Sequence, residues 1–236
     1  FINVCYLSIS RRTRKGRYKR MKRKKELILG VILLVVFIIW TGLIQYVDVK
    51  PIGVDNTYIG FSTLNNWFHF LTGVHMTLYT ITDWLGLIPI FICVVFGGLG
   101  LVQLIKRKSL FKVDKDLILL GIYYFIVIIG YLIFEMIPIN YRPILIDGRL
   151  EASYPSSTAL LVLSVMPTLL LQVKRRSTHI FITKIVSVAT ILFSLFMVTG
   201  RLIAGVHWLT DIIGALILSA GLYYVYKALV FIFCDK

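Results

Sequence analysis

The chain has 236 residues, of which 58% are hydrophobic and only 16% charged, and its formal net charge is +15. A soluble domain of this length carries more charge and fewer apolar residues, so the composition argues against a water-soluble fold. The basic excess does not indicate nucleic-acid binding, because no nucleic-acid-reading module accompanies it and 11 of the 26 basic residues lie between Arg11 and Lys25.

That basic block belongs to the N-terminal segment, residues 1–26, which we predict to be cytoplasmic, because Lys and Arg beside a spanning helix bind anionic lipid headgroups on that side. Met21 is followed by four basic residues and then an apolar run, so we expect it to be the natural start, with residues 1–20 upstream of it. The run at residues 27–47 is too long for a signal-peptide core and lacks a small-residue cleavage site. We therefore predict a retained first transmembrane helix there.

Residues 48–83 are predicted to form a long outer loop. Between Phe61 and Leu71 the apolar residues recur at helical spacing, which predicts an amphipathic helix lying at the membrane interface. His69 and His75 are six positions apart and would not share a helix face, so we expect no metal site, and no other cofactor is indicated. The three cysteines show no ligand or pairing spacing, so no disulfide is expected either.

Residues 84–233 are predicted to form a core of five further transmembrane helices. Each run approaches the ~20 apolar residues needed to cross a bilayer core, although the fourth is short. Because backbone amides in lipid must be bonded within their own segment, these runs should be helices. The fold class is therefore an all-α polytopic membrane protein with six transmembrane helices in a bundle. The five runs are Trp84–Ile105, Leu117–Ile139, Thr158–Val173, Ile180–Thr199 and Leu209–Phe233.

The positive charges predict the orientation of this bundle. Every basic cluster falls on one side of a six-span zigzag, which carries 22 of the 26 basic residues; the other side carries Lys50, Arg142, Arg149 and Arg201. We therefore predict a multi-pass protein of the cell membrane with both termini cytoplasmic and with the loops after the first, third and fifth spans on the extracytoplasmic side. The basic terminus and short loops favour a bacterial cytoplasmic membrane.

Three polar groups lie at the extracytoplasmic ends of the spans, whereas Asp147 and Glu151 between them are interpreted as solvated loop charges. The groups are Arg142-Pro143 after the third span, Pro155-Ser156-Ser157-Thr158 at the start of the fourth, and Gly200-Arg201 with His207 and Asp211 between the fifth and sixth.

The third group has the chemistry of a histidine nucleophile. If the sixth helix begins near His207, then Asp211 lies one turn away on the same face and can accept the imidazole Nδ1–H, leaving Nε2 free to attack. Arg201 offers a bidentate cation suited to phosphate. A helix that begins after Pro155 would direct free backbone N–H groups at an anion.

In order and spacing, the three groups resemble the signature of the type 2 phosphatidic acid phosphatase and haloperoxidase superfamily, in its membrane lipid phosphatase branch. That signature is Lys-x6-Arg-Pro, then Pro-Ser-Gly-His, then Ser-Arg-x5-His-x3-Asp. The resemblance covers roughly residues 84–230. Its third part is the most specific, because Arg201, His207 and Asp211 are all in register.

The resemblance implies roles for individual residues. His207 would form a phosphohistidine and Asp211 would orient it, as the two catalytic residues. Phosphate would be held by the remaining matched positions, Arg142, Arg201, Ser156, Ser157 and Thr158. This would be phosphoryl transfer by positioning and electrostatic stabilisation, without a metal.

Three positions depart from the family signature. Gly200 replaces its Ser, Thr158 replaces the His that protonates the leaving group, and Glu135 replaces its phosphate-binding Lys. The role of Glu135 is open: its carboxylate would repel phosphate unless it is protonated, paired with a nearby arginine, or itself the missing acid.

The loss of the acid has a consequence for the substrate. A threonine hydroxyl does not deliver a proton near neutral pH, which matters greatly for an alkoxide leaving group and little for phosphate, whose relevant pKa is about 6. We therefore expect hydrolysis of a phosphorylated lipid, with a polyprenyl or other lipid pyrophosphate favoured. Two alternatives stay open: a catalytically impaired relative that only binds phosphorylated lipids, and a phosphotransferase. The expected partners are the lipid substrate and membrane lipids, without nucleic acid.

Overall fold

The computed structural model describes the backbone of residues 2–234 and the side chains from Met21 onward. Most of the predicted basic segment, residues 1–26, lies outside the described side chains. The expectation that Met21 is the natural start concerns residues 1–20, whose side chains also lie outside that part. Within it the elements are helical, apart from three isolated β-bridges. In chain order they are α1 (Ile2–Tyr46), η1 (Val54–Asn56), α2 (Ser62–Thr72), α3 (Met76–Leu85), α4 (Leu87–Arg107), η2 (Leu110–Lys112), α5 (Lys115–Met136), α6 (Ser157–Arg176), α7 (Ile180–Ile203) and α8 (Leu209–Phe233).

Six stretches of the described chain are long and apolar enough to cross a membrane, which confirms the predicted all-α, six-span fold. The second begins at Met76 rather than Trp84, because α3 continues into α4 through Gly86. The polar residues of α3 do not end the helix, since the hydroxyls of Thr80 and Thr82 bond to carbonyls one turn back in the same helix.

Helix α6 is the central helix of the bundle, and it explains why the fourth apolar run is the weakest of the predicted spans. Its mean hydropathy, 1.5, is the lowest of the six, and more of it is buried inside the protein than of any other described span. Its polar side chains meet partners from neighbouring helices: Tyr124 bonds to Thr168, and Gln172 donates to Tyr226. A span surrounded by protein can carry polar residues that a lipid-facing span cannot.

Helix α1 packs along α8 through small residues. A side-chain carbon added to Gly30 would lie 2.7 Å from Val225, and one added to Gly221 would lie 3.0 Å from Leu34, so the two backbones approach closely. The ion pair between Lys227 and Glu26, at 2.8 Å, closes the end of this contact.

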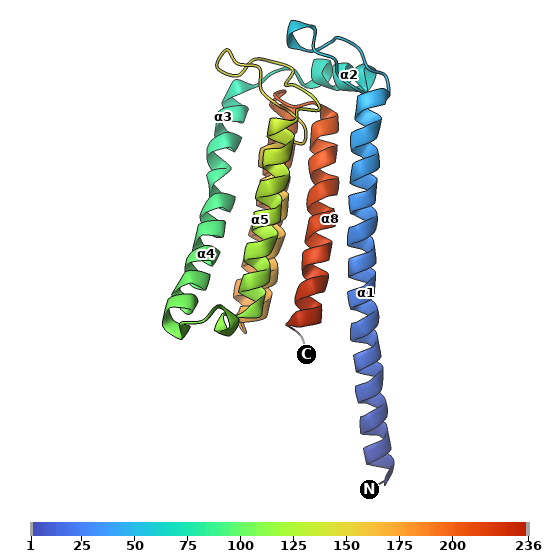
Figure 1. Cartoon of the computed structure of the whole chain (residues 1–236), viewed down its shortest axis with the longest axis vertical. Helices are drawn as coiled ribbons and strands as arrows, with labels where there is room; N and C mark the ends of the chain where they lie inside the picture. The colour runs from blue at the N-terminus through green and yellow to red at the C-terminus, as the bar shows by residue number, and fades with distance from the viewer. Residues whose placement is uncertain (1, 235–236) are drawn as a thin grey trace.

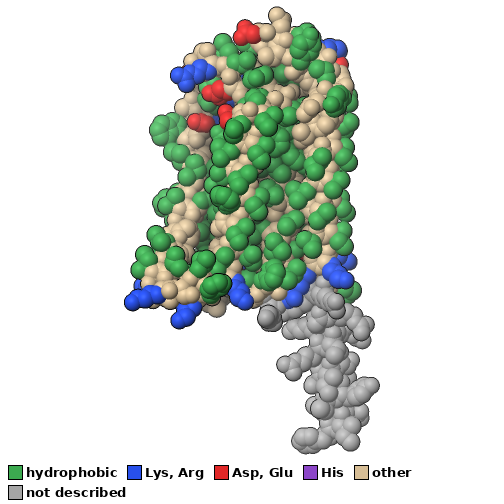
Figure 2. All heavy atoms as spheres, in the orientation of Figure 1, with side chains coloured by type: hydrophobic (Ala, Val, Ile, Leu, Met, Phe, Trp, Pro, Cys, Tyr) green, Lys and Arg blue, Asp and Glu red, His purple; other side chains and the backbone are tan. Residues whose placement is uncertain are grey.

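The long helices stand side by side, and α1 begins at the end of the bundle where α8 ends (Figure 1). The connections that follow α1, α5 and α7 gather at the opposite end, where α2 lies across the bundle. In the face shown in Figure 2, Lys and Arg side chains gather along the first end, whereas acidic side chains lie near the second. Side chains from distant parts of the sequence therefore meet at the loop-bearing end.

Candidate active site

The loop between α5 and α6 folds back on itself and brings two site residues together. Arg142 and Glu151 pair through a backbone bond of 3.1 Å, next to a bridge between Tyr141 and Ala152. The chain reverses at Asp147-Gly148, where both residues have positive φ. As a result Arg142, near the start of the loop, and Ser153, near its end, both reach the start of α8.

The short connection between α7 and α8 holds His207 in a buried position. The residue is 3% exposed, and the loop turns through Gly205, whose φ is +70°. A side-chain carbon on Gly205 would lie 2.0 Å from the carbonyl oxygen of Gly73, so the segment before α3 packs tightly against this loop. His69 of α2 reinforces it with a 3.1 Å bond to the Gly205 carbonyl. His207 is thus clamped from the α2–α3 side.

The imidazole of His207 is connected to Asp211 through a third residue. His207 Nδ1 lies 3.2 Å from Ser153 Oγ, and Ser153 Oγ in turn donates to Asp211 Oδ2. The direct distance from Nδ1 to Asp211 Oδ2 is 3.8 Å, too long for a hydrogen bond. The expected direct bond is therefore absent. The reason is that α8 begins at Leu209, so His207 precedes the helix instead of sharing a face with Asp211.

Asp211 is fully buried and held by further donors. Its Oδ2 accepts the backbone N–H of Trp208 at 2.8 Å, capping the first turn of α8, and its Oδ1 accepts Asn140 Nδ2 at 3.3 Å. With Ser153 these make three donors aimed at one carboxyl group.

The protonation state of His207 follows from its surroundings. Burial lowers the pKa of His207 well below its ordinary value, and the positive charges of Arg142 and Arg201 lower it further. The imidazole is therefore neutral at physiological pH. With Nδ1 bonded to Ser153, the second nitrogen, Nε2, is buried and has no hydrogen-bond partner among the described residues.

Two buried arginines accompany this imidazole. Arg142 is 7% exposed and lies 3.1 Å from Glu151 Oε2, while Arg201 is 1% exposed and lies 3.5 Å from Asp83 Oδ1. The guanidinium of Arg201 also stacks over the ring of Tyr79, 4.8 Å from its centre. Within the described part of the chain, Arg142 Nη1 and Arg201 Nε have no hydrogen-bond partner. Buried, unpartnered cationic donors of this kind are suited to an anionic ligand.

The three hydroxyl residues at the start of α6 occupy different surroundings. The backbone N–H of Ser156 donates to the Asp211 carbonyl at 3.2 Å, so it is not the free anion donor that the sequence suggested, although its buried Oγ has no partner among the described atoms. Ser157 lines a hollow beside His207. Thr158 does not line this hollow; its methyl group lies against Gly86, at the joint of α3 and α4.

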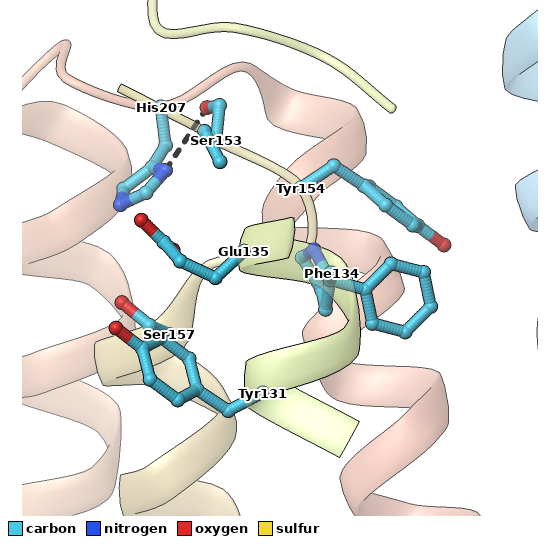
Figure 3. A pocket seen from close by; sticks show the side chains of 9 residues that line it. Tyr131, Phe134, Glu135, Ser153, Tyr154, Ser157 and His207 are labelled. Atoms are coloured by element: carbon cyan, nitrogen blue, oxygen red, sulfur yellow. Dashed lines mark hydrogen bonds between the residues drawn. The ribbon is translucent and has the colours of Figure 1, made fainter. Parts of the chain in front are cut away.

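Glu135, in the last turn of α5, lines the same hollow (Figure 3). Its carboxylate points toward His207, whereas the rings of Phe134 and Tyr154 point away. Glu135 forms no salt bridge with any residue whose side chain is described, and the nearby Arg142 pairs with Glu151 instead. Glu151, interpreted from the sequence as a solvated loop charge, keeps 37% of its side chain exposed and in addition pairs with Arg142.

Comparisons with known proteins agree with this geometry. Residues 135–233 match the family model of the PAP2 superfamily. This part of the chain belongs to the PAP2 superfamily. The chain also resembles in fold the first transmembrane PAP2 type phosphatidylglycerolphosphate phosphatase from Bacillus subtilis, with a TM-score of 0.61 and 16% sequence identity over 85% of this chain and 94% of that one. A search of curated protein sequences finds no match.

The PAP2 region contains every residue proposed from the sequence for the site, from Glu135 to Asp211. Asp83 and Tyr79 lie before it, and together with Ser153, Asn140 and Glu151 they are the site residues that the sequence did not reveal. Asp83 could have been found from the sequence, because a charged residue near the outer end of a span usually faces a partner. Ser153 and Asn140 offer no such signal, since neither falls at a motif position.

Proposed function

We propose that this PAP2 protein is a membrane lipid phosphatase that hydrolyses a phosphorylated lipid through a phosphohistidine at His207. One observation carries the proposal: a buried, neutral imidazole presents an unpartnered Nε2 within the influence of two buried arginines that have unused donors. The pair of arginines offsets the charge of a phosphoryl group, and the lone pair of Nε2 supplies the nucleophile.

The reaction follows from these positions. Nε2 attacks phosphorus while the bond to the leaving oxygen breaks, and the phosphoryl group stays on the imidazole, whose Nδ1 keeps its proton. Water then attacks the phosphorus, the N–P bond breaks, and inorganic phosphate leaves as Nε2 regains its lone pair. Arg142 and Arg201 hold the phosphoryl oxygens through both steps.

The substrate class rests on the leaving group. Thr158, at the position of the family acid, carries no group that protonates an alkoxide, and its methyl lies against Gly86. A leaving phosphate needs little such help. A lipid pyrophosphate, such as a polyprenyl pyrophosphate, is therefore the favoured substrate.

The distribution of charge supports an extracytoplasmic site. Basic side chains gather at the end of the bundle opposite the site (Figure 2), and such residues mark the cytoplasmic side of a membrane protein. Both termini would then be cytoplasmic, and the substrate would be hydrolysed at the outer surface.

The proposal is tested by trapping the intermediate. Purified protein in detergent is mixed with a lipid pyrophosphate labelled in its terminal phosphate, and rapid quenching should show acid-labile, base-stable label on the protein. His207→Asn should remove the label and the phosphate release, whereas His179→Asn, at an exposed histidine outside the site, should keep both. Turnover by His207→Asn at the normal rate would overturn the proposal.

The same experiment separates the alternatives. A protein that only binds phosphorylated lipids would release no phosphate, yet its lipid binding would weaken in an Arg142→Ala variant. A phosphotransferase would label His207 but pass the group to an added acceptor alcohol faster than to water.

A further inference from the structure

A serine that belongs to none of the recognised motifs lies between the nucleophile and its acid. Ser153 Oγ is 3.2 Å from His207 Nδ1 and donates to Asp211 Oδ2, whereas the two partners are 3.8 Å apart. Resting on the proposed function of His207, we propose that Ser153 is a positioning residue that transmits the influence of Asp211 to the imidazole and fixes which nitrogen carries the proton.

The direction of the hydrogen bonds follows from counting protons. A serine hydroxyl has one hydrogen to donate and two lone pairs to accept with. Asp211 receives N–H groups from Trp208 and Asn140 as well, so it acts as an acceptor, and the single proton of Ser153 is committed to it. Ser153 Oγ can then only accept from His207. The proton must therefore reside on Nδ1, which leaves the lone pair on Nε2.

The rest of the loop keeps Ser153 in this place. Its backbone N–H donates to the Asn140 carbonyl at 2.9 Å, and the residue is 2% exposed. The next residue, Tyr154, anchors the chain: its ring stacks on Phe37 of α1, and its hydroxyl bonds to Thr41 at 2.7 Å. These contacts hold the hydroxyl of Ser153 in a fixed position.

This arrangement matters most when the imidazole becomes positively charged. In the phosphohistidine the ring carries the phosphoryl group on Nε2 and the proton on Nδ1. The chain from Nδ1–H through Ser153 to the carboxylate then stabilises that charge without moving a proton. Replacing Ser153 by Ala would remove the hydroxyl that links Nδ1–H to the carboxylate, and it would open a gap that Asp211 does not span.

The experiment reads the tautomer directly and does not need a substrate. ¹⁵N-histidine-labelled protein has four histidines, and the His207 signals are identified by their loss in His207→Asn. The wild type should show a protonated Nδ1 and an unprotonated Nε2. Ser153→Ala should raise the fraction with the proton on Nε2, and with substrate it should lower kcat about tenfold or more at nearly unchanged KM, as expected when a histidine loses its correct tautomer.

Two further variants control for a purely structural effect. Ser164→Ala makes the same change at another fully buried serine, whose hydroxyl has no partner among the described residues, and should alter neither the tautomer nor kcat. Ser153→Cys keeps the side-chain shape but bonds weakly, and should behave like Ser153→Ala if the latter fails to fold.

The outcomes distinguish this inference from the proposed function. A wild-type tautomer in both Ser153 variants overturns the role of Ser153, even if the protein is an active phosphatase. A shifted tautomer in those variants, combined with a wild type that turns over no lipid phosphate, upholds the role of Ser153 and overturns the function.

Discussion

Arg201 Nη1 lies 3.5 Å from Asp83 Oδ1, and this contact joins the end of α7 to α3 at the edge of the proposed phosphate site. The arginine is 1% exposed, so in the absence of substrate Asp83 supplies a negative charge beside it. An incoming phosphate has to compete with that carboxylate for the same guanidinium. If phosphate binds as proposed, Asp83 would stabilise the buried charge of Arg201 when the site holds no phosphate and would oppose phosphate binding.

Asp83→Asn should shift this competition toward the ligand. We expect inorganic phosphate to inhibit the variant at roughly three- to tenfold lower concentration, because one competing charge is removed. The ligand-free variant should also unfold at a lower temperature, since a buried cation is left without a counter-charge. Asp55→Asn, at an exposed position in η1, should change neither quantity. Weaker inhibition in Asp83→Asn would show that Asp83 instead orients Arg201.

Gly205→Ala should disable the loop that carries His207. The backbone there has φ +70°, which costs a non-glycine residue about 1–2 kcal/mol, and the added carbon would lie 2.0 Å from the Gly73 carbonyl. We expect loss of most phosphatase activity together with a lower unfolding temperature. Gly97→Ala, where an added carbon meets nothing within 4 Å, is the matched control and should leave both unchanged. Normal activity in Gly205→Ala would mean that the close contact with Gly73 does not hold His207.

His207 should remain neutral at pH values that protonate an ordinary histidine. Its pKa is lowered by burial and then by the two arginines, so a free imidazole with pKa about 6.5 protonates first as the pH falls. Below about pH 6.5 the unfolded chain therefore binds a proton at this imidazole, whereas the folded chain does not. Because of this difference, the free energy of unfolding decreases as the pH falls below about 6.5. Titration of the His207 ¹⁵N signals checks this. A midpoint at or above 6.5 would contradict it.

A lipid pyrophosphate should be hydrolysed faster than the monophosphate of the same lipid. The reason is that no acid stands at position 158, so the leaving group departs without a proton. The kcat/KM values of the two lipids in the same detergent provide the measurement, and a series of aryl phosphates should show a steep dependence on the pKa of the leaving phenol. Equal or faster turnover of the lipid monophosphate would count against this account.

Glu135→Gln should improve substrate binding. The carboxylate points toward His207 and has no salt-bridge partner in the described part of the chain, so it repels an incoming phosphate. We expect KM to fall by roughly threefold or more, in keeping with the removal of one nearby like charge. Glu135→Asp retains the charge and should keep the wild-type KM. A large fall in kcat in Glu135→Gln, without change in KM, would instead identify Glu135 as the missing acid.

The fold was accessible from the sequence because lipid imposes a simple rule on each span. Long apolar runs had to be helices, and the six that were predicted are present. The boundary at Met76 was missed because Thr80 and Thr82 make α3 look like loop, although their hydroxyls bond within the helix. Such local bonds are invisible in a hydropathy pattern.

The site was accessible only in part. The four-residue spacing of His207 and Asp211 does bring them close together, but where α8 begins decides whether they bond, and that depends on capping by Asp211 itself. Ser153 is 54 positions from His207, and no spacing rule connects the two. Contacts of this kind arise from the folding of a loop, whereas motif spacing reports only neighbours along one element.

Helices α2 and α3 contact the part of the chain that carries the motif residues, which matters for the choice of a shortened fragment. Asn65 bonds to the hydroxyl and the backbone of Thr210 at the start of α8, and Asp83 balances the charge of Arg201. Asn65 and Asp83 both lie in the part of the chain that precedes the matched region, residues 135–233. A fragment cut to residues 135–233 would keep every motif residue, yet it would lose the contacts that Asn65 and Asp83 make with Thr210 and Arg201.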